Sequence, residues 1–354
     1  MPKKIIFCSQ DPGSANALTP VIKKLEQGNQ FTVQVFATKQ SCEFFNQAGI
    51  SFQDLNGKLF NQQVITEKPD LIILGASSGF SIEKQAIIYG KDNTIPTVSI
   101  LDFWSNYALR YSGNGNDLVY LPDYIFTMDE ISKTRMIKEK IPKNKIIVTG
   151  NPFFDTFLES NESKEKQPHK DYSQENTAHK NNILYISQPL VKEGKFIPDT
   201  KTIDECIKII KEMSEDISLT IKCHPKEDHL RYHEAFKNAK ISVTVLGKSD
   251  VKKLIETHQI ILGKHSMVLF QAVCLGKTVI SYQPIQKKYD CLITNDLGIS
   301  YRANNIEELK SLLKKSIKKS LPSTDRNQIS RYIDGKNTTR VISEIKKILN
   351  IKNQ

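Results

Sequence analysis

The sequence predicts an α/β protein built from two parallel sheets, each covered by helices on both faces. Short runs of Ile, Leu and Val alternate with helix-like segments along most of the 354 residues. Such unbroken apolar strands are typical of parallel sheets that are buried on both faces. Between Glu159 and Asn182 the chain becomes hydrophilic and has too few apolar residues to fold on its own. We therefore expect two Rossmann-like halves joined by an exposed linker.

The first half is expected to alternate strands and helices from its first residues. Its strands are predicted at residues 4–9, 31–37, 71–74, 97–101, 124–127 and 146–149, with helices at 16–26, 41–47 and 81–89. In the second half the predicted strands are 183–187, 219–223, 241–245, 259–262 and 278–281, and a helix begins near Ser266. A last helix carries an apolar stripe that must pack against something: Val341, Ile342, Ile345, Ile348 and Leu349.

These patterns divide the chain into four parts. Residues 1–150 form the first Rossmann-like domain, 151–182 the linker, 183–334 the second Rossmann-like domain and 335–354 a basic amphipathic helix. We expect the two domains to face each other across a cleft and the last helix to pack back on the first domain.

Composition indicates a globular protein, with 39% hydrophobic and 25% charged residues. No apolar run approaches the roughly 20 residues that span a bilayer, and the start of the chain lacks a signal-peptide core. We therefore expect a cytoplasmic protein. The six cysteines form no CxxC pair, so they are expected to be reduced and mostly buried.

The net charge of +11 is concentrated near the end of the chain, where residues 305–354 hold 12 Lys and Arg against five acidic residues. This basic tail is compatible with peripheral membrane association, although a solvated helix face is the favoured explanation. Nucleic-acid binding is not expected, because no aromatic residues interleave with the basic ones. The sequence leaves the oligomeric state open.

Two polar clusters follow predicted strands in the first half. Asp11 precedes Pro12, Gly13 and Ser14, where Gly13 permits close backbone approach and Ser14 can cap a helix beside an anion. After the strand at 97–101, Asp102 can act as a general base, while Trp104 and Asn106 can hold an acceptor group. Ordinary capping and packing are the alternative for both clusters. Ser77, Ser78 and Glu83 are weaker candidates at the same edge.

The second half has its own strand-end cluster. His224 ends a β-branched strand, Pro225 fixes the turn, and Lys226 adds positive charge; as an imidazolium, His224 can stabilise a phosphate. Lys264, His265 and Ser266 open a helix, whose first amides can hold an anion. Gln188 follows a neighbouring strand, and Gln271 lies further along the helix, where it can reach a ribose.

These residues predict a nucleotide or nucleotide-sugar site without a metal or another cofactor. His224, His229 and His233 do not have the HExxH spacing of a zinc site, and the spacing places no strong third ligand.

The motifs resemble those of the GT-B superfamily. Residues 149–155, Thr-Gly-Asn-Pro-Phe-Phe-Asp, are similar to its inter-domain segment, and the superfamily includes the non-hydrolysing UDP-N-acetylglucosamine 2-epimerases. Residues 183–284, with His224 and Pro225, resemble bacterial sialyl- and polysialyltransferases. Two departures stand out: the acidic tripeptide of those transferases is absent, and the epimerases carry Gly-Gly and Glu where this chain has His265, Ser266 and Gln271.

The resemblance implies an inverting, metal-independent glycosyltransferase of surface polysaccharide or glycolipid synthesis. The donor would be a nucleotide-sugar bound by the second domain, and the acceptor a glycan or lipid-linked sugar bound by the first. Asp102 or Asp11 would be the general base. Two alternatives remain open: a sugar-nucleotide epimerase or hydrolase of the UDP-N-acetylglucosamine 2-epimerase type, and a non-catalytic nucleotide-sugar-binding protein.

Overall fold

A computed structural model of the chain divides into two compact units. One comprises residues 1–166 and 330–354, and the other residues 167–329. The structure describes residues 1–38, 40–61, 65, 67–157, 181–188, 190–192, 195–197, 199–213, 216–225, 227–236, 241–285, 289–321 and 327–351. Most of the predicted linker lies outside these residues, and so does Lys226. The domain boundaries predicted from the sequence stay predictions, although each predicted Rossmann-like half falls mainly in one unit.

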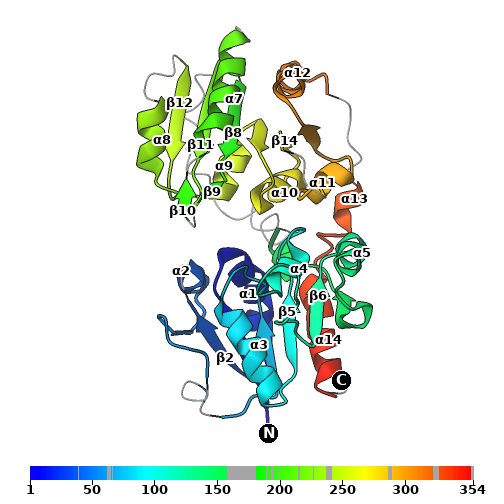
Figure 1. The fold of residues 1–354 in the computed structure, drawn as a ribbon. Coiled ribbons are helices and arrows are strands. Elements are labelled where there is room, and N and C mark those ends of the chain that lie inside the picture. Colours follow the sequence, from blue (N-terminus) through cyan, green and yellow to red (C-terminus); the bar gives the residue numbers. More distant parts are fainter. Residues whose placement is uncertain are drawn as a thin grey trace. The chain divides into compact units, whose positions relative to one another are not determined.

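The first unit contains a parallel sheet with the strand order β3-β2-β1-β4-β5-β6-β7 (Figure 1). Its strands are β1 (Lys3–Ser9), β2 (Phe31–Ala37), β3 (Gln53–Asp54), β4 (Leu71–Leu74), β5 (Thr97–Ile100), β6 (Tyr124–Thr127) and β7 (Ile146–Val148). Its helices are α1 (Pro12–Glu26), α2 (Gln40–Ala48), α3 (Ile82–Asp92), α4 (Tyr107–Arg110), α5 (Glu130–Lys138) and α14 (Asn337–Ile348), with short 3-10 turns η1 (Lys143–Lys145) and η2 (Pro152–Asp155).

The second unit contains a parallel sheet with the order β12-β11-β8-β13-β14-β15 and a separate antiparallel hairpin. The sheet strands are β8 (Asn181–Ile186), β11 (Ile217–Lys222), β12 (Ser242–Leu246), β13 (Ile260–Gly263), β14 (Thr278–Tyr282) and β15 (Tyr301–Ala303); the hairpin is β9 (Leu190–Lys192) and β10 (Lys195–Ile197). The helices are α7 (Thr200–Glu212), α8 (His229–Phe236), α9 (Val251–Thr257), α10 (Met267–Cys274), α11 (Ile293–Asp296), α12 (Ile306–Ile317) and α13 (Asn327–Ser330), the last residue of which belongs to the first unit.

The predicted fold class is therefore confirmed: both units are parallel α/β sheets. In each sheet the chain starts at an inner strand and adds the next strands toward one edge. It then crosses back and adds the remaining strands toward the other edge. The order reverses between β1 and β4 in the first unit and between β8 and β13 in the second. Open α/β sheets bind ligands outside the carboxyl ends of the strands at such reversal points. The topology thus marks one candidate binding edge in each unit.

The last helix packs on the first unit, as predicted. Val341 and Ile345 of α14 are fully buried in the same apolar cluster as Val21 and Ile22 of α1, and Ile342, Ile348 and Leu349 pack at its margin. The apolar stripe of the last helix thus packs in the core of the first unit, while the membrane association considered for the basic charges of this region stays a prediction. No helix in the described residues combines the length and hydrophobicity that a membrane crossing needs.

The start of the first helix is the main local difference from the prediction. The sequence pattern placed it at Asn16, but α1 begins at Pro12. Proline fits the first turn of a helix, where its missing N–H would have no partner. Gly13 and Ser14 consequently lie within the first turn of α1.

Candidate functional site

Three segments meet at the candidate edge of the first unit. Ser14 of α1 packs so closely on the end of β4 that a Cβ on Gly75 would overlap its side chain. The backbone N–H of Ala76 donates to Ser14 Oγ at 3.3 Å, and the hydroxyls of Ser14 and Ser77 lie 3.4 Å apart. These contacts join the β1–α1 loop to the residues that follow β4.

Asp102 lies at the same edge, beside Gly13. Its Oδ1 pairs with Arg110 Nη1 at 2.8 Å, and a Cβ on Gly13 would overlap its Oδ2. Arg110 also donates to the carbonyl oxygens of Ala76 and Ser105. Asp102 is thus a fixed carboxylate rather than a freely moving one. Arg110 was not singled out from the sequence, because the pairing depends on how α4 folds back.

The other candidates of the first unit have different surroundings. Asp11 stands at the N-cap position of α1, but its side chain makes no capping bond. Asn106, at the N-cap position of α4, has left-handed backbone dihedral angles with φ +58° and an exposed side chain. Trp104 is fully buried: its Nε1 donates to Asp129 Oδ2 at 2.7 Å, and its ring stacks on Phe154. The packing role weighed for Trp104 is the one that its burial supports.

At the edge of the second unit, Gln188 clamps the loop that follows β13. Its Nε2 donates to the carbonyl oxygen of His265, and its Oε1 accepts from the backbone N–H of the same residue, both at 2.7 Å. Since β8 and β13 are neighbours in the sheet, this pair bridges the reversal point. The side chain of Gln188 therefore positions His265 and Ser266.

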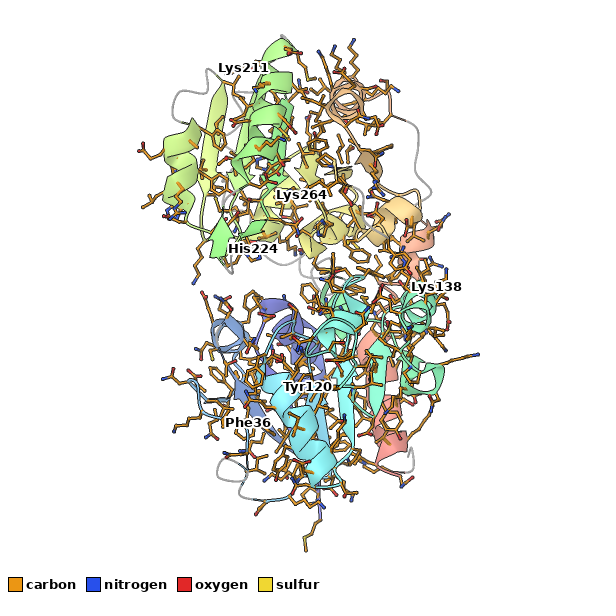
Figure 2. All side chains as sticks on the ribbon, in the orientation of Figure 1. Phe36, Tyr120, Lys138, Lys211, His224 and Lys264 are labelled. Atoms are coloured by element: carbon orange, nitrogen blue, oxygen red, sulfur yellow. The ribbon has the colours of Figure 1, made fainter. Side chains whose placement is uncertain are left out.

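Ser266 and Lys264 also have defined local partners. Ser266 is the N-cap of α10 and accepts from the backbone N–H of Val268 at 3.1 Å. Lys264 Nζ forms a close ion pair with Asp199, whose carboxylate caps α7 through Thr202. Gln271 is half-buried on α10. Figure 2 marks Lys264 and His224 on the second unit.

The turn that presents His224 is held by a residue that the sequence reading missed. Glu227 Oε2 accepts from the backbone N–H of His224 at 2.7 Å, while its Oε1 accepts from Tyr232 OH and Ser187 Oγ. This contact resembles one half of a capping box, in which a Glu side chain reaches back three residues to a backbone N–H, and the spacing is visible in the sequence. Pro225 is exposed, and the half-buried His224 lies beside β8, whose end carries Ser187.

Buried lysine adds positive charge beneath His224. Lys222, the last residue of β11, is only 8% exposed, and its ammonium donates to the carbonyl oxygen of Cys223 at 2.7 Å. Desolvation lowers the pKa of Lys222, while the Cys223 and Glu227 side chains act in the opposite direction. The edge thus combines a histidine, a buried lysine and the start of α10, a combination suited to an anion.

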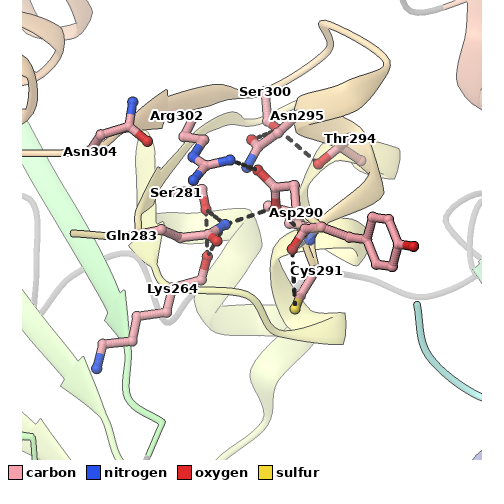
Figure 3. A network of polar contacts seen from close by, with 12 residues as sticks. Lys264, Ser281, Gln283, Asp290, Cys291, Thr294, Asn295, Ser300, Arg302 and Asn304 are labelled. Carbon is pink, nitrogen blue, oxygen red and sulfur yellow. Dashed lines mark hydrogen bonds and ion pairs between the residues drawn. The ribbon is translucent and has the colours of Figure 1, made fainter. Parts of the chain in front are cut away.

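A second polar network adjoins this edge, because Ser281 and Gln283 both donate to the carbonyl oxygen of Lys264 (Figure 3). Asp290 accepts from Arg302 Nη1 at 3.0 Å, Gln283 Nε2 at 2.9 Å and Asn295 Nδ2 at 2.9 Å. Gln283 also donates to Ser281. These bonds hold the segment between β14 and α11 against β15, which indicates a structural role.

Comparisons with known proteins identify the family. The family model described as UDP-N-acetylglucosamine 2-epimerase matches residues 120–346, more than half of the chain. The chain belongs to the UDP-N-acetylglucosamine 2-epimerase family. No curated protein sequence matches it significantly.

Solved structures of this family share the fold over the whole chain. The complex of S. aureus MnaA with UDP has a TM-score of 0.73 at 17% identity, covering 99% of this chain and 98% of that one. The Methanocaldococcus jannaschii UDP-GlcNAc 2-epimerase with UDP-GlcNAc and UDP has a TM-score of 0.73 at 17% identity, covering 97% and 99%. The Neisseria meningitidis UDP-GlcNAc 2-epimerase bound to UDP-GlcNAc has a TM-score of 0.65 at 18% identity, covering 97% and 100%.

The family match overturns the predicted glycosyltransferase activity, including its role in polysaccharide or glycolipid synthesis. That prediction was wrong because GT-B transferases and these epimerases share one architecture, and a fold does not define its chemistry. The transferase was preferred over the epimerase because of the short motif of His224 and Pro225, which both kinds of enzyme could contain. The family match supports the epimerase instead, which was an alternative in the sequence analysis.

Proposed function

We propose that this protein is a nucleotide-sugar epimerase that inverts C2 of the sugar in UDP-N-acetylglucosamine. The observation that carries the proposal is the family match across residues 120–346, which includes the whole edge around His224, His265 and Ser266. The solved relatives bound to UDP or UDP-GlcNAc support the same substrate class.

The second unit has the groups that such a substrate needs. We propose that its diphosphate binds near the start of α10, where the first helical amides carry partial positive charge and the Ser266 hydroxyl can donate a hydrogen bond. His224 and Lys222 would add positive charge. Inversion at C2 requires that one hydrogen leaves the carbon and another is returned to the opposite face, so a general base and a general acid are needed. Asp102, ordered by Arg110, is our candidate base; Asp11 stays an alternative, and neither a metal nor another cofactor is proposed.

Nucleotide binding can be tested by thermal unfolding in the presence of UDP, CMP, GDP and ADP. A ligand that binds only the folded protein raises the melting temperature by mass action. We expect UDP to give the largest shift, and we expect His224→Ala to reduce it. His233→Ala is the matched control, because His233 is exposed on α8.

A CMP-selective shift would instead support the resemblance of residues 183–284 to sialyltransferases, and it would count against the UDP-sugar proposal. An unchanged UDP shift in a folded His224→Ala variant would remove His224 from the site. A folded Asp102→Asn variant is expected to keep the UDP shift and lose turnover, since Asp102 is proposed to act on the sugar.

A further inference from the structure

A carboxyl group is buried at the edge of the first unit, and none of the proposed chemistry uses it. Glu83 lies in the first turn of α3 and is 2% exposed. Its Oε1 accepts from Ser77 Oγ at 2.6 Å and from the backbone N–H of Gln10 at 2.9 Å. Its Oε2 is buried and has no hydrogen-bond partner in the described part of the chain. The two oxygens thus have very different surroundings.

This asymmetry fits a neutral carboxylic acid better than a carboxylate. An ionised carboxylate spreads its charge over both oxygens, and a buried oxygen without a donor leaves that charge uncompensated. A neutral acid has one carbonyl oxygen, which accepts, and one hydroxyl, whose lack of a partner costs less than an uncompensated charge. Oε1 has the surroundings of the carbonyl oxygen, and Oε2 those of the hydroxyl.

The charged groups around Glu83 agree with this assignment. Desolvation by burial is the main cause that raises the pKa of Glu83, and the Asp11 carboxylate acts in the same direction. The polar groups of Ser77, of the Glu83 backbone and of Ser81 oppose the rise, but the pKa of Glu83 stays raised. Lys84 acts in the opposite direction, because its ammonium and an ionised Glu83 attract each other, but that ammonium is directed to the carbonyl oxygen of Ser112 at 2.5 Å. Cys8 on β1 is a buried thiol whose own pKa is raised.

Glu83 binds two segments of this edge directly, at Ser77 and at Gln10. Through Ser77 it reaches Ser14 at the start of α1, and through Gln10 it reaches the end of β1. Ser14 is next to Gly13, against which Asp102 is packed. A shift of Glu83 would therefore pass to the loop and to the carboxylate proposed as the base.

We propose that Glu83 is a positioning residue that works as a neutral acid: its carbonyl oxygen holds Ser77 and the β1–α1 loop in place beside Asp102. Its effect on turnover rests on the proposed function, whereas its protonation state does not. Ionisation of Glu83 would place a second negative charge near Asp11 and loosen the loop.

The protonation state can be tested by thermal unfolding of the whole chain as a function of pH, with Glu83→Gln as the variant. Glutamine keeps an acceptor for Ser77 and Gln10 but cannot ionise. Because the folded pKa is raised above the unfolded one, the proton stabilises the fold fully below the unfolded value, and this stabilisation is lost as pH rises through the folded value. The melting temperature of the wild type should therefore fall relative to Glu83→Gln across that window.

Glu130→Gln is the matched control, since Glu130 is exposed in the first turn of α5. It should follow the wild-type pH profile. A constant difference between the wild type and Glu83→Gln at every pH would overturn the proposal. If the glutamine variant does not fold, the infrared carbonyl band of a protonated carboxyl in the folded wild type decides instead. The band should disappear only above the raised pKa, and its absence at neutral pH would also overturn the proposal.

Turnover of UDP-N-acetylglucosamine gives the second readout. Glu83→Gln should keep kcat within about threefold of the wild type, and any decrease in the kcat of the wild type at alkaline pH should be absent from this variant. Glu83→Ala should lower kcat at least about tenfold with little change in KM. Equal inactivity of both folded variants would mean that an ionised Glu83 is required. If no turnover exists at all, the proposed function fails, and the pH profile of unfolding still decides the state of Glu83.

Discussion

Gly13 is the residue at which the two strand-end clusters of the first unit meet. A side chain at this position would overlap Asp102 Oδ2, and Asp102 cannot move away freely because Arg110 holds its other oxygen. We expect Gly13→Ala to destabilise the protein by about 1–3 kcal/mol, as overpacked sites do. Denaturant unfolding measures this change.

Gly28→Ala is the control for that substitution. Nothing lies within 4 Å of a Cβ at Gly28, so its replacement should change stability by less than about 1 kcal/mol. Equal effects of the two substitutions would show that Asp102 is not fixed against Gly13.

The solvent exposure of the Trp104 side chain distinguishes a packing role from a ligand-binding role. It is the single tryptophan of the chain and is fully buried against Phe154 and Tyr332. We predict that iodide barely quenches the tryptophan fluorescence of the folded protein and quenches it strongly after unfolding in guanidinium chloride. Comparable quenching in both states would place the indole at the surface, as a ligand-binding role requires.

At the scale of elements, the sequence predicted most strands of the two sheets and missed a few very short ones. Strands β2 and β4 have the predicted bounds, β2 through its apolar and β-branched residues and β4 through an uninterrupted apolar run. The two-residue β3, the hairpin of β9 and β10, and the three-residue β15 were not predicted, since none of them has the run of three apolar residues that marks the equally short β7. Contacts such as Asp102 with Arg110 and Gln188 with His265 depend on how loops fold back, which local patterns do not contain.

The packing of the last helix, α14, predicts how substitutions on its two sides change stability. Ile345 of α14 is fully buried in the core of the first unit, so Ile345→Ala should lower the free energy of unfolding by about 2–5 kcal/mol. Lys347 lies on the exposed side of the same helix, and Lys347→Ala should cost less than about 1 kcal/mol even though it removes the pair with Glu344. Equal costs would indicate that α14 does not belong to this core.

For the molecule as a whole, the sequence predicted the architecture correctly and the reaction wrongly, while the nucleotide-sugar ligand stays a prediction. Parallel strands with polar residues at their ends define binding edges, and both edges lie where the strand order reverses. Transfer and epimerisation differ in what happens to the bound sugar, and His224, Ser266 and Asp102 suit either chemistry. Only the family match separated them.

The most direct test of the account is proton NMR of UDP-N-acetylglucosamine incubated with the protein and no acceptor. We predict that signals of the C2 epimer appear, either as the UDP-sugar or as the free sugar together with UDP, and that Asp102→Asn prevents their appearance. A substrate that stays unchanged while UDP still raises the melting temperature would contradict the epimerase account and indicate a protein that binds nucleotide-sugars without converting them.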